Sequence, residues 1–169
     1  MARSPFIADI VALRRHQGHR EHLAVRAPLT GLRVTASEIP RDEPVDLELQ
    51  LEAVEGGIVV TGTARARWAG ECRRCLQPVD GELTADVDEL FVNDYEEGET
   101  YPIGGDHIDL EPLAREALVL ALPLAPLCRL DCAGLCPTCG ADLNRGPCDC
   151  PPADTDPRWA ALDALRREP

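Results

Sequence analysis

The sequence has little of what marks membrane-spanning or secreted proteins. It contains no run of about eighteen apolar residues, so we expect no transmembrane helix. Its start has no basic segment leading into a continuous apolar run, so we expect no secretory signal peptide. Aromatic residues make up only 4% of the chain, and the core must therefore be built from aliphatic side chains. We predict a cytoplasmic protein whose thiols stay reduced.

The sequence also lacks the residue patterns on which most enzymes depend. It has no glycine-rich phosphate-binding loop, and no histidine base lies near a plausible nucleophile. We therefore predict a protein that is not an enzyme and that has no small-molecule substrate.

Charge is distributed unevenly along the chain. Residues 1–33 carry six arginines and two acids, a net charge of +4, whereas residues 34–111 carry five arginines and twenty acids, a net charge of −15. The acidic middle argues against a broad, nonspecific grip on nucleic acid, which depends on clustered basic residues. It fits a basic partner better, although an acidic surface also serves solubility.

Six of the eight cysteines lie between Cys128 and Cys150, a density that indicates a metal site. Residues 136–140, Cys-Pro-Thr-Cys-Gly, have the form of half a zinc site, because two thiolates reach one ion and Gly140 can adopt the positive φ that the turn needs. The other ligands must come from upstream or downstream. One ligand from each flank would enclose Zn²⁺ most compactly, so the expected set is Cys132, Cys136, Cys139 and Cys150, with Cys128 and Cys148 as spare or alternative ligands. Disulfides and an iron–sulfur cluster are the alternatives.

A second Cys-x-x-Cys, formed by Cys72 and Cys75, falls between two expected strands. Two thiols alone bind metal poorly. The pair can supply auxiliary ligands to spare thiols of the C-terminal cluster, form a redox dithiol, or shape a structural turn. The βαβ pattern of thioredoxin-like dithiols does not occur around it, which favours an auxiliary or structural role.

Apolar and polar residues alternate strictly from Val45 to Ala53 and again from Val79 to Asp88, and residues 58–68 between them are expected to return as the partner strand. This period of two indicates half-buried strands. A tight turn at residues 55–57 separates the first two strands, which predicts an antiparallel meander with one wet, acidic face. A shorter strand is expected at residues 6–11, and residues 93–106 are expected to form an exposed loop.

Helical spacing of apolar residues begins after Asp109, which can serve as the N-cap, and ends at Pro123. A last short helix is expected to start at Asp156 and Pro157. The overall prediction is an α+β fold: an antiparallel β-rich domain over residues 1–110, then residues 111–169 with the covering helix, a zinc-binding module at residues 128–150 and the C-terminal helix.

Two surfaces are candidates for partner binding. The basic N-terminal segment offers Arg14, Arg15 and Arg20 as phosphate contacts for RNA. The polar side of the expected sheet offers a negative surface for a basic protein, made of Asp46, Glu48, Glu52, Glu82, Asp86 and Asp88.

The two cysteine motifs together resemble those of the YceD family, the large ribosomal RNA subunit accumulation proteins. Residues 70–79, Gly-Glu-Cys-Arg-Arg-Cys-Leu-Gln-Pro-Val, are similar to the family's C-x-R-C-L-x-P signature between two strands. The run from Leu127 to Asn144, with Cys148 and Cys150 after it, is similar to the cysteine-rich tail of part of the family. The closing residues 156–162 are similar to the usual terminus.

The resemblance implies a bacterial, cytosolic, non-enzymatic factor that supports accumulation of large-subunit rRNA. Such a factor would bind precursor rRNA, a basic large-subunit ribosomal protein, or both. Family members without the cysteine-rich tail exist, so a zinc module would not be the whole activity. One alternative is an acidic chaperone of a ribosomal protein that makes no RNA contact, and a second is a thiol redox protein that uses Cys72 and Cys75.

Overall fold

The computed structural model describes residues 4–151 and residue 158 of the chain. The helix expected from Asp156 onward lies outside the described residues. No helix within the described part is both long and apolar enough to cross a membrane.

One eight-stranded sheet dominates the structure, in the order β1-β8-β7-β6-β5-β4-β2, with β3 pairing separately with β5. Only β6 and β7 run parallel; the other pairs are antiparallel. The strands are β1 (Ile7–Asp9), β2 (Arg20–Pro28), β3 (Ser37–Glu38), β4 (Pro44–Val54), β5 (Gly57–Glu71), β6 (Pro78–Val92), β7 (Tyr101–Gly104) and β8 (His107–Asp109). Within residues 4–151 the helical elements are a 3-10 turn, η1 (Leu13–Arg15), and one α-helix, α1 (Glu111–Ala121).

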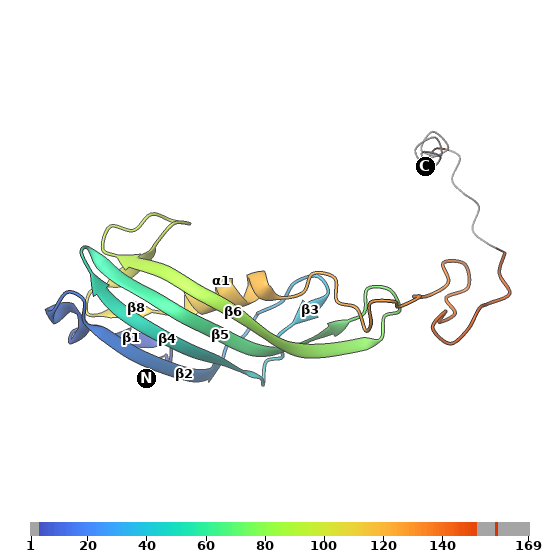
Figure 1. Cartoon of the computed structure of the whole chain (residues 1–169), viewed down its shortest axis with the longest axis horizontal. Coiled ribbons are helices and arrows are strands. Elements are labelled where there is room, and N and C mark those ends of the chain that lie inside the picture. The colour runs from blue at the N-terminus through green and yellow to red at the C-terminus, as the bar shows by residue number, and fades with distance from the viewer. Residues whose placement is uncertain (1–3, 152–157, 159–169) are drawn as a thin grey trace, which may run out of the picture.

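The expected meander is formed by the long strands β4, β5 and β6 (Figure 1). Alternate residues of β4 point to the core, and Val45, Leu47, Leu49 and Leu51 are each no more than 2% exposed. The acids between them are exposed or half-buried. The alternation therefore specified both the strand and the side that it buries.

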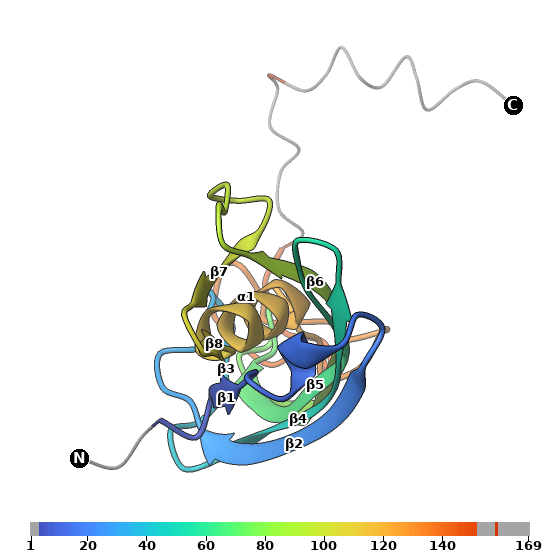
Figure 2. The same ribbon diagram turned by 90° about the vertical axis from the view of Figure 1, so that its left-hand side faces the viewer.

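Helix α1 lies in the hollow of the curved sheet, as the end-on view shows (Figure 2). Leu113, Ala114 and Leu118 are buried in the same hydrophobic core as the strands. Asp109 accepts a hydrogen bond at 2.9 Å from the backbone N–H of Glu111, although the N-cap position itself is Leu110. The prediction of a β-rich fold with a covering helix is confirmed, and the division at residue 110 stays a prediction.

The expected exposed loop at residues 93–106 is shorter than the sequence suggested. Strand β7 begins at Tyr101, whose ring stacks on Phe91 with centroids 5.1 Å apart. Strand β8 follows, and its Ile108 is fully buried. Glycines and acids in this stretch masked a small hairpin whose few apolar residues reach the core. The N-terminal strand is likewise shorter than expected and spans only Ile7–Asp9.

Strand β5 sets the long axis of the sheet. The β4–β5 turn and the β5–β6 turn lie at its opposite ends, at Val54–Gly57 and Glu71–Pro78. After α1 the chain returns toward the β5–β6 turn and runs on beyond it through residue 151 without a further helix or strand (Figure 1). All eight cysteines belong to this end of the molecule.

Candidate metal centres

The eight cysteines form two groups of four in the structure. We call them the hairpin tetrad, which contains Cys72, Cys75, Cys128 and Cys132, and the tail tetrad, which contains Cys136, Cys139, Cys148 and Cys150. Within each tetrad all four Sγ atoms lie within 4.8 Å of one another, and all eight cysteines are free thiols.

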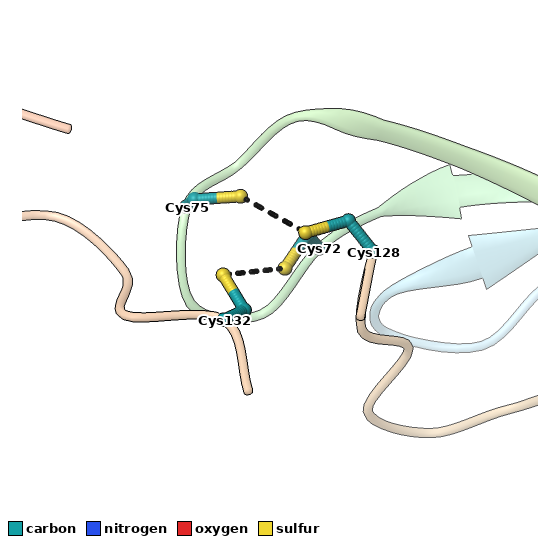
Figure 3. A group of neighbouring side chains, drawn as sticks. All are labelled: Cys72, Cys75, Cys128 and Cys132. Atoms are coloured by element: carbon teal, nitrogen blue, oxygen red, sulfur yellow. Dashed lines mark hydrogen bonds between the residues drawn. The ribbon is translucent and has the colours of Figure 1, made fainter. Parts of the chain in front are cut away.

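The sulfur–sulfur distances of the hairpin tetrad match those around a metal ion. Sγ of Cys72 lies 3.8 Å from Sγ of Cys132, and Sγ of Cys75 lies 3.6 Å from Sγ of Cys128 (Figure 3). A tetrahedron with Zn–S bonds of about 2.3 Å has edges of roughly 3.8 Å. A disulfide would require about 2.05 Å. The arrangement therefore fits four ligands around one ion.

The two Cys-x-x-Cys turns have the same backbone design. In the hairpin turn the N–H of Cys72 donates to Gln77 O at 2.8 Å, and the N–H of Leu76 donates to Cys72 O at 2.9 Å. In the tail turn the equivalent bonds run from Cys136 to Ala141 O at 2.8 Å and from Gly140 to Cys136 O at 2.9 Å. Two segments far apart in the sequence thus present a pair of thiols in the same way.

The residue after the second cysteine adopts a left-handed conformation in both turns. Gly140 has φ of 73° and Leu76 has φ of 59°, the one positive φ of a non-glycine residue among those described. Such a conformation costs an L-residue about 1–2 kcal/mol. Because the hairpin turn adopts it with leucine, the neighbouring structure must compensate for that cost.

The C-terminal segment is fastened to the hairpin turn through backbone contacts. The N–H of Arg73 donates to Pro126 O at 2.9 Å, and the N–H of Leu135 donates to Arg74 O at 3.0 Å. The Arg74 guanidinium also donates to Cys132 O at 2.8 Å. These bonds bring Cys128 and Cys132 against the hairpin.

Asn144 contacts the hairpin tetrad from within the tail segment. Its Nδ2 donates to Sγ of Cys132 at 3.5 Å and to Oδ1 of Asp142 at 2.7 Å, while its Oδ1 accepts from the N–H of Ala133 at 2.8 Å. Groups that hydrogen-bond to ligands in this way orient them for a metal. Asn144 lies between Cys139 and Cys148 in the sequence, so a residue of the tail segment holds a thiol of the hairpin tetrad.

The first thiol of each Cys-x-x-Cys turn ionises readily. The backbone N–H of Cys128 is the main cause that lowers the pKa of Cys72 to about 6. The N–H groups of Cys139 and Thr138 lower the pKa of Cys136 to about 6. Fixed N–H dipoles therefore favour the thiolate form of the first cysteine in each Cys-x-x-Cys turn.

Other thiols of the same tetrads resist ionisation. Burial, followed by the neighbouring thiol of Cys132, raises the pKa of Cys128 to about 12. The thiol of Cys139, followed by burial, raises the pKa of Cys150 to about 12. Four adjacent thiolates repel one another, and a soft divalent cation would remove that repulsion.

The structure divides the cysteines differently from the expected zinc set. Cys136, Cys139 and Cys150 lie together, but their fourth neighbour is Cys148, and Cys132 belongs to the hairpin tetrad. The expected set of Cys132, Cys136, Cys139 and Cys150 is therefore not one of the two groups. Of the roles considered for Cys72 and Cys75, the geometry matches auxiliary ligands that reach spare thiols of the C-terminal cluster.

The expected phosphate contacts lie at the opposite end of β5 from the tetrads. Arg14 and Arg15 belong to η1, and Arg20 begins β2. Arg14 donates to Gly105 O at 2.9 Å, and Arg20 forms an ion pair with Glu52 at 2.9 Å. Two of the three arginines thus already have partners within the protein.

The expected acidic surface is divided into two parts. Strand β5 separates the acids of β4 from those of β6. The β4 acids have basic partners on β2: besides the Glu52 pair, Glu48 contacts His22 at 3.1 Å and Asp46 contacts Arg26 at 2.9 Å. The remaining acids of the set, Glu82, Asp86 and Asp88, lie on β6.

Sequence reasoning missed Asn144 and Arg74 as supporting residues of the site. Both residues lie within the cysteine motifs, and this position in the sequence could have indicated that they support the site. Their roles depend on contacts across more than ten residues, 58 in the case of Arg74 and Cys132, and spacing alone does not show such contacts.

Comparison with known proteins places the chain in a family. The family described as large ribosomal RNA subunit accumulation protein YceD matches residues 60–166, which include both tetrads. An uncharacterized protein of Mycobacterium tuberculosis is 40% identical over 169 residues, covering 94% of this chain and 80% of the relative. An uncharacterized protein of Mycobacterium leprae is 35% identical over 167 residues, covering 94% and 76%.

A named plant protein is similar as well. "Large ribosomal RNA subunit accumulation protein YCED homolog 1, chloroplastic" of Arabidopsis thaliana is 26% identical over 178 residues, covering 85% of this chain and 56% of the relative. No solved structure matches. The matched region and the coverage of the mycobacterial relatives show that the chain belongs to the YceD family of large ribosomal RNA subunit accumulation proteins.

Proposed function

We propose that the protein is a non-enzymatic, cytoplasmic factor in assembly of the large ribosomal subunit that supports accumulation of its rRNA. Membership of the YceD family carries the proposal, since the matching residues 60–166 span most of β5, strands β6 to β8, the helix and both tetrads. The role in rRNA accumulation is taken from the family description.

Each tetrad is proposed to bind one structural Zn²⁺. Four sulfur donors within 4.8 Å of one another would fill all four positions around one ion and leave none open for a substrate, which is the form of structural rather than catalytic zinc. In the hairpin tetrad the ion would join the β5–β6 turn to the segment that follows α1. The metal would then hold an otherwise irregular tail in one position on the sheet.

The binding partner is proposed to be a basic large-subunit ribosomal protein, precursor rRNA, or both. The protein partner has the stronger physical support, because Glu82, Asp86 and Asp88 are exposed on β6 while two of the three candidate RNA-binding arginines are engaged internally. An acidic chaperone without RNA contact is therefore the second candidate. A thiol redox role would require Cys72 and Cys75 to leave their tetrad.

The function is tested by depleting the protein from its host cells and measuring the ratio of large-subunit to small-subunit rRNA. We expect the ratio to fall and wild-type protein to restore it. Cys72→Ser tests the hairpin tetrad in the same assay, with Ser4→Ala, far from the tetrads, as the control. An unchanged ratio after depletion would contradict the proposed function.

RNA contact is tested separately with Arg14→Gln, Arg15→Gln and Arg20→Gln combined. If these side chains bind phosphates, the triple variant binds rRNA more weakly, and the slope of log affinity against log salt falls by about one for each phosphate that is no longer neutralised. Arg41→Gln, Arg65→Gln and Arg67→Gln combined give the same charge change at other sites. If wild type and both variants bind rRNA with equal affinity and equal slope, the RNA contact through these arginines is contradicted, and the protein partner remains as the proposal.

A further inference from the structure

Strand β6 has a long open edge. It pairs with β5 along its whole length, Pro78–Val92, but with β7 only at Phe91 and Val92. Residues 78–90 therefore have no strand neighbour on their second side within the described part of the chain (Figure 1). Alternate backbone N–H and C=O groups of an edge strand point outward and are able to pair with another strand.

The outward side chains of this edge strand are acidic. Asp80, Glu82, Asp86 and Asp88 are exposed and occupy four of the five alternate outward positions from 80 to 88, and Thr84 occupies the fifth. Across the β5–β6 ladder, Glu82 is opposite Arg67, whereas Asp86 is opposite Thr63 and Asp88 is opposite Thr61, so no basic residue lies directly opposite Asp86 or Asp88. The one ion pair found for the four acids in residues 4–151 joins Asp80 to Arg67 at 3.8 Å.

Strand β4 is also acidic, but unlike residues 78–90 of β6 it has a neighbouring strand on both sides. Its outward acids alternate as those of β6 do, and β2 lies beside it antiparallel. β2 places Arg20, His22 and Arg26 at alternate positions, which contact Glu52, Glu48 and Asp46 at 2.9, 3.1 and 2.9 Å. An acidic strand is thus completed by an extended strand whose outward residues are basic.

We propose that the open edge of β6 binds an extended basic segment of a partner protein, which adds to the sheet as a strand with Arg or Lys at alternate positions. Main-chain hydrogen bonds would supply affinity, and the acids would select for the basic residues. The inference rests on the protein-partner half of the proposed function and specifies its surface and mode.

Charge disfavours two other occupants of this edge. A second copy of the chain pairing through β6 would set acids against acids, which is destabilising. A nucleic acid would bring phosphates against the same carboxylates. Proline is absent from the strand after Pro78, so no residue within the edge prevents pairing.

The first test uses a nine-residue peptide of alternating Arg and Val, which has the length of β2. We expect the full-length protein to bind it and the combined variant Glu82→Gln, Asp86→Asn, Asp88→Asn to bind about tenfold more weakly at low salt, since three cross-strand charge pairs are worth roughly 1.5 kcal/mol. The control variant Glu96→Gln, Glu97→Gln, Glu99→Gln removes the same charge from the loop at residues 93–100. Equal weakening by both variants would overturn the proposal.

The second test examines the backbone pairing without changing the protein. In an extended peptide the N–H groups of neighbouring residues point to opposite edges, so methylating the nitrogens of the Arg residues and those of the Val residues blocks different edges. We expect one methylated peptide to lose binding and the other to retain it. Retention by both peptides would mean that charge alone holds the peptide, and a protein dimer that the β6 variant disrupts would assign the edge to a second copy; either result overturns the proposal.

These outcomes are separable from those of the rRNA assay. If depletion lowers the rRNA ratio but replacing the β6 acids does not weaken peptide binding, only the assignment of the edge is overturned. If the ratio does not respond to depletion while the peptide binds as a strand, the proposed function is contradicted and the binding surface stands.

Discussion

Leu76 and Gly140 occupy the same position in two equivalent cysteine turns, and both have positive φ. Glycine adopts this conformation without steric cost, whereas leucine does not. We expect Leu76→Gly to raise the free energy of unfolding by about 1 kcal/mol and Gly140→Ala to lower it by a similar amount. A Cβ at Gly140 would meet no atom within 4 Å, so only the backbone conformation is tested there.

Denaturant unfolding of the metal-loaded protein provides the measurement for both variants. Thr138→Ala, within the same turn but not at the left-handed position, is the control and is expected to change stability little. A decrease in stability in Leu76→Gly would show that the packing of the leucine side chain outweighs its backbone strain.

Glu89 is partly buried next to other acids, and its charge is therefore expected to lower the stability of the fold. Burial, then the charges of Glu116 and Asp88, raises the pKa of Glu89 above its usual value. A raised carboxyl pKa disfavours the folded state once pH exceeds the unfolded pKa, so the penalty is present at pH 7 and absent below about pH 4. We expect Glu89→Gln to stabilise by a few tenths of a kcal/mol at pH 7, because solvent screens most of the repulsion.

Thermal unfolding at pH 7 and at about pH 4 tests this dependence. Glu97→Gln in the exposed loop makes the same charge change away from these neighbours and is expected to have little effect at either pH. An equal gain from both variants would attribute the effect to net charge rather than to local repulsion.

At the scale of an element, the close approach of β4 and β5 depends on Gly62. Its φ is 148°, and a Cβ there would overlap Glu48 O and lie 2.9 Å from the Cα of Leu49. Because backbone atoms cannot move aside as a flexible side chain can, we expect Gly62→Ala to destabilise by more than about 2 kcal/mol. Thr63→Ala on the same strand is expected to cost under about 1 kcal/mol. Equal unfolding midpoints of Gly62→Ala and wild type would contradict this account of the strand pair.

At the scale of the whole molecule, metal is expected to order one end without supporting the sheet. The sheet and α1 share a largely aliphatic core that does not include the cysteines. A separate buried cluster contains Cys72, Cys75 and Cys132. Removing zinc should therefore abolish order in the tetrads while the strands persist. Circular dichroism should retain the β signal after chelation, and amide exchange should rise in residues 127–150.

Metal analysis tests the same separation into two sites. We expect two equivalents of zinc in wild type and about one in either Cys72→Ser or Cys136→Ser, since each variant removes one ligand from one tetrad. Acidification should release both ions, because protons compete for the thiolates. A single equivalent in wild type, absent from Cys136→Ser and retained in Cys72→Ser, would restrict metal binding to the tail tetrad.

The strands and the helix could be predicted because their signals are local. Alternation in β4 and β6 and helical spacing in α1 are properties of neighbouring residues, and burial of Leu49 or Leu118 follows from them. The hairpin of β7 and β8 was missed because it is short and rich in glycine and acids. Its support comes from Phe91 and from β1, which are remote in sequence.

The sequence by itself determined the family, the meander, the covering helix and the presence of cysteine motifs with metal-ligand spacing, because each depends on a pattern of residues close together in the sequence. Tertiary structure alone decided which thiols meet and which acids are neutralised. Cys72 joins Cys132 across 60 residues, and Arg26 pairs with Asp46 across 20, because the chain returns to the β5–β6 turn and β2 folds onto β4. Ligand sharing and charge pairing depend on distance in space, and one-dimensional spacing does not specify that distance.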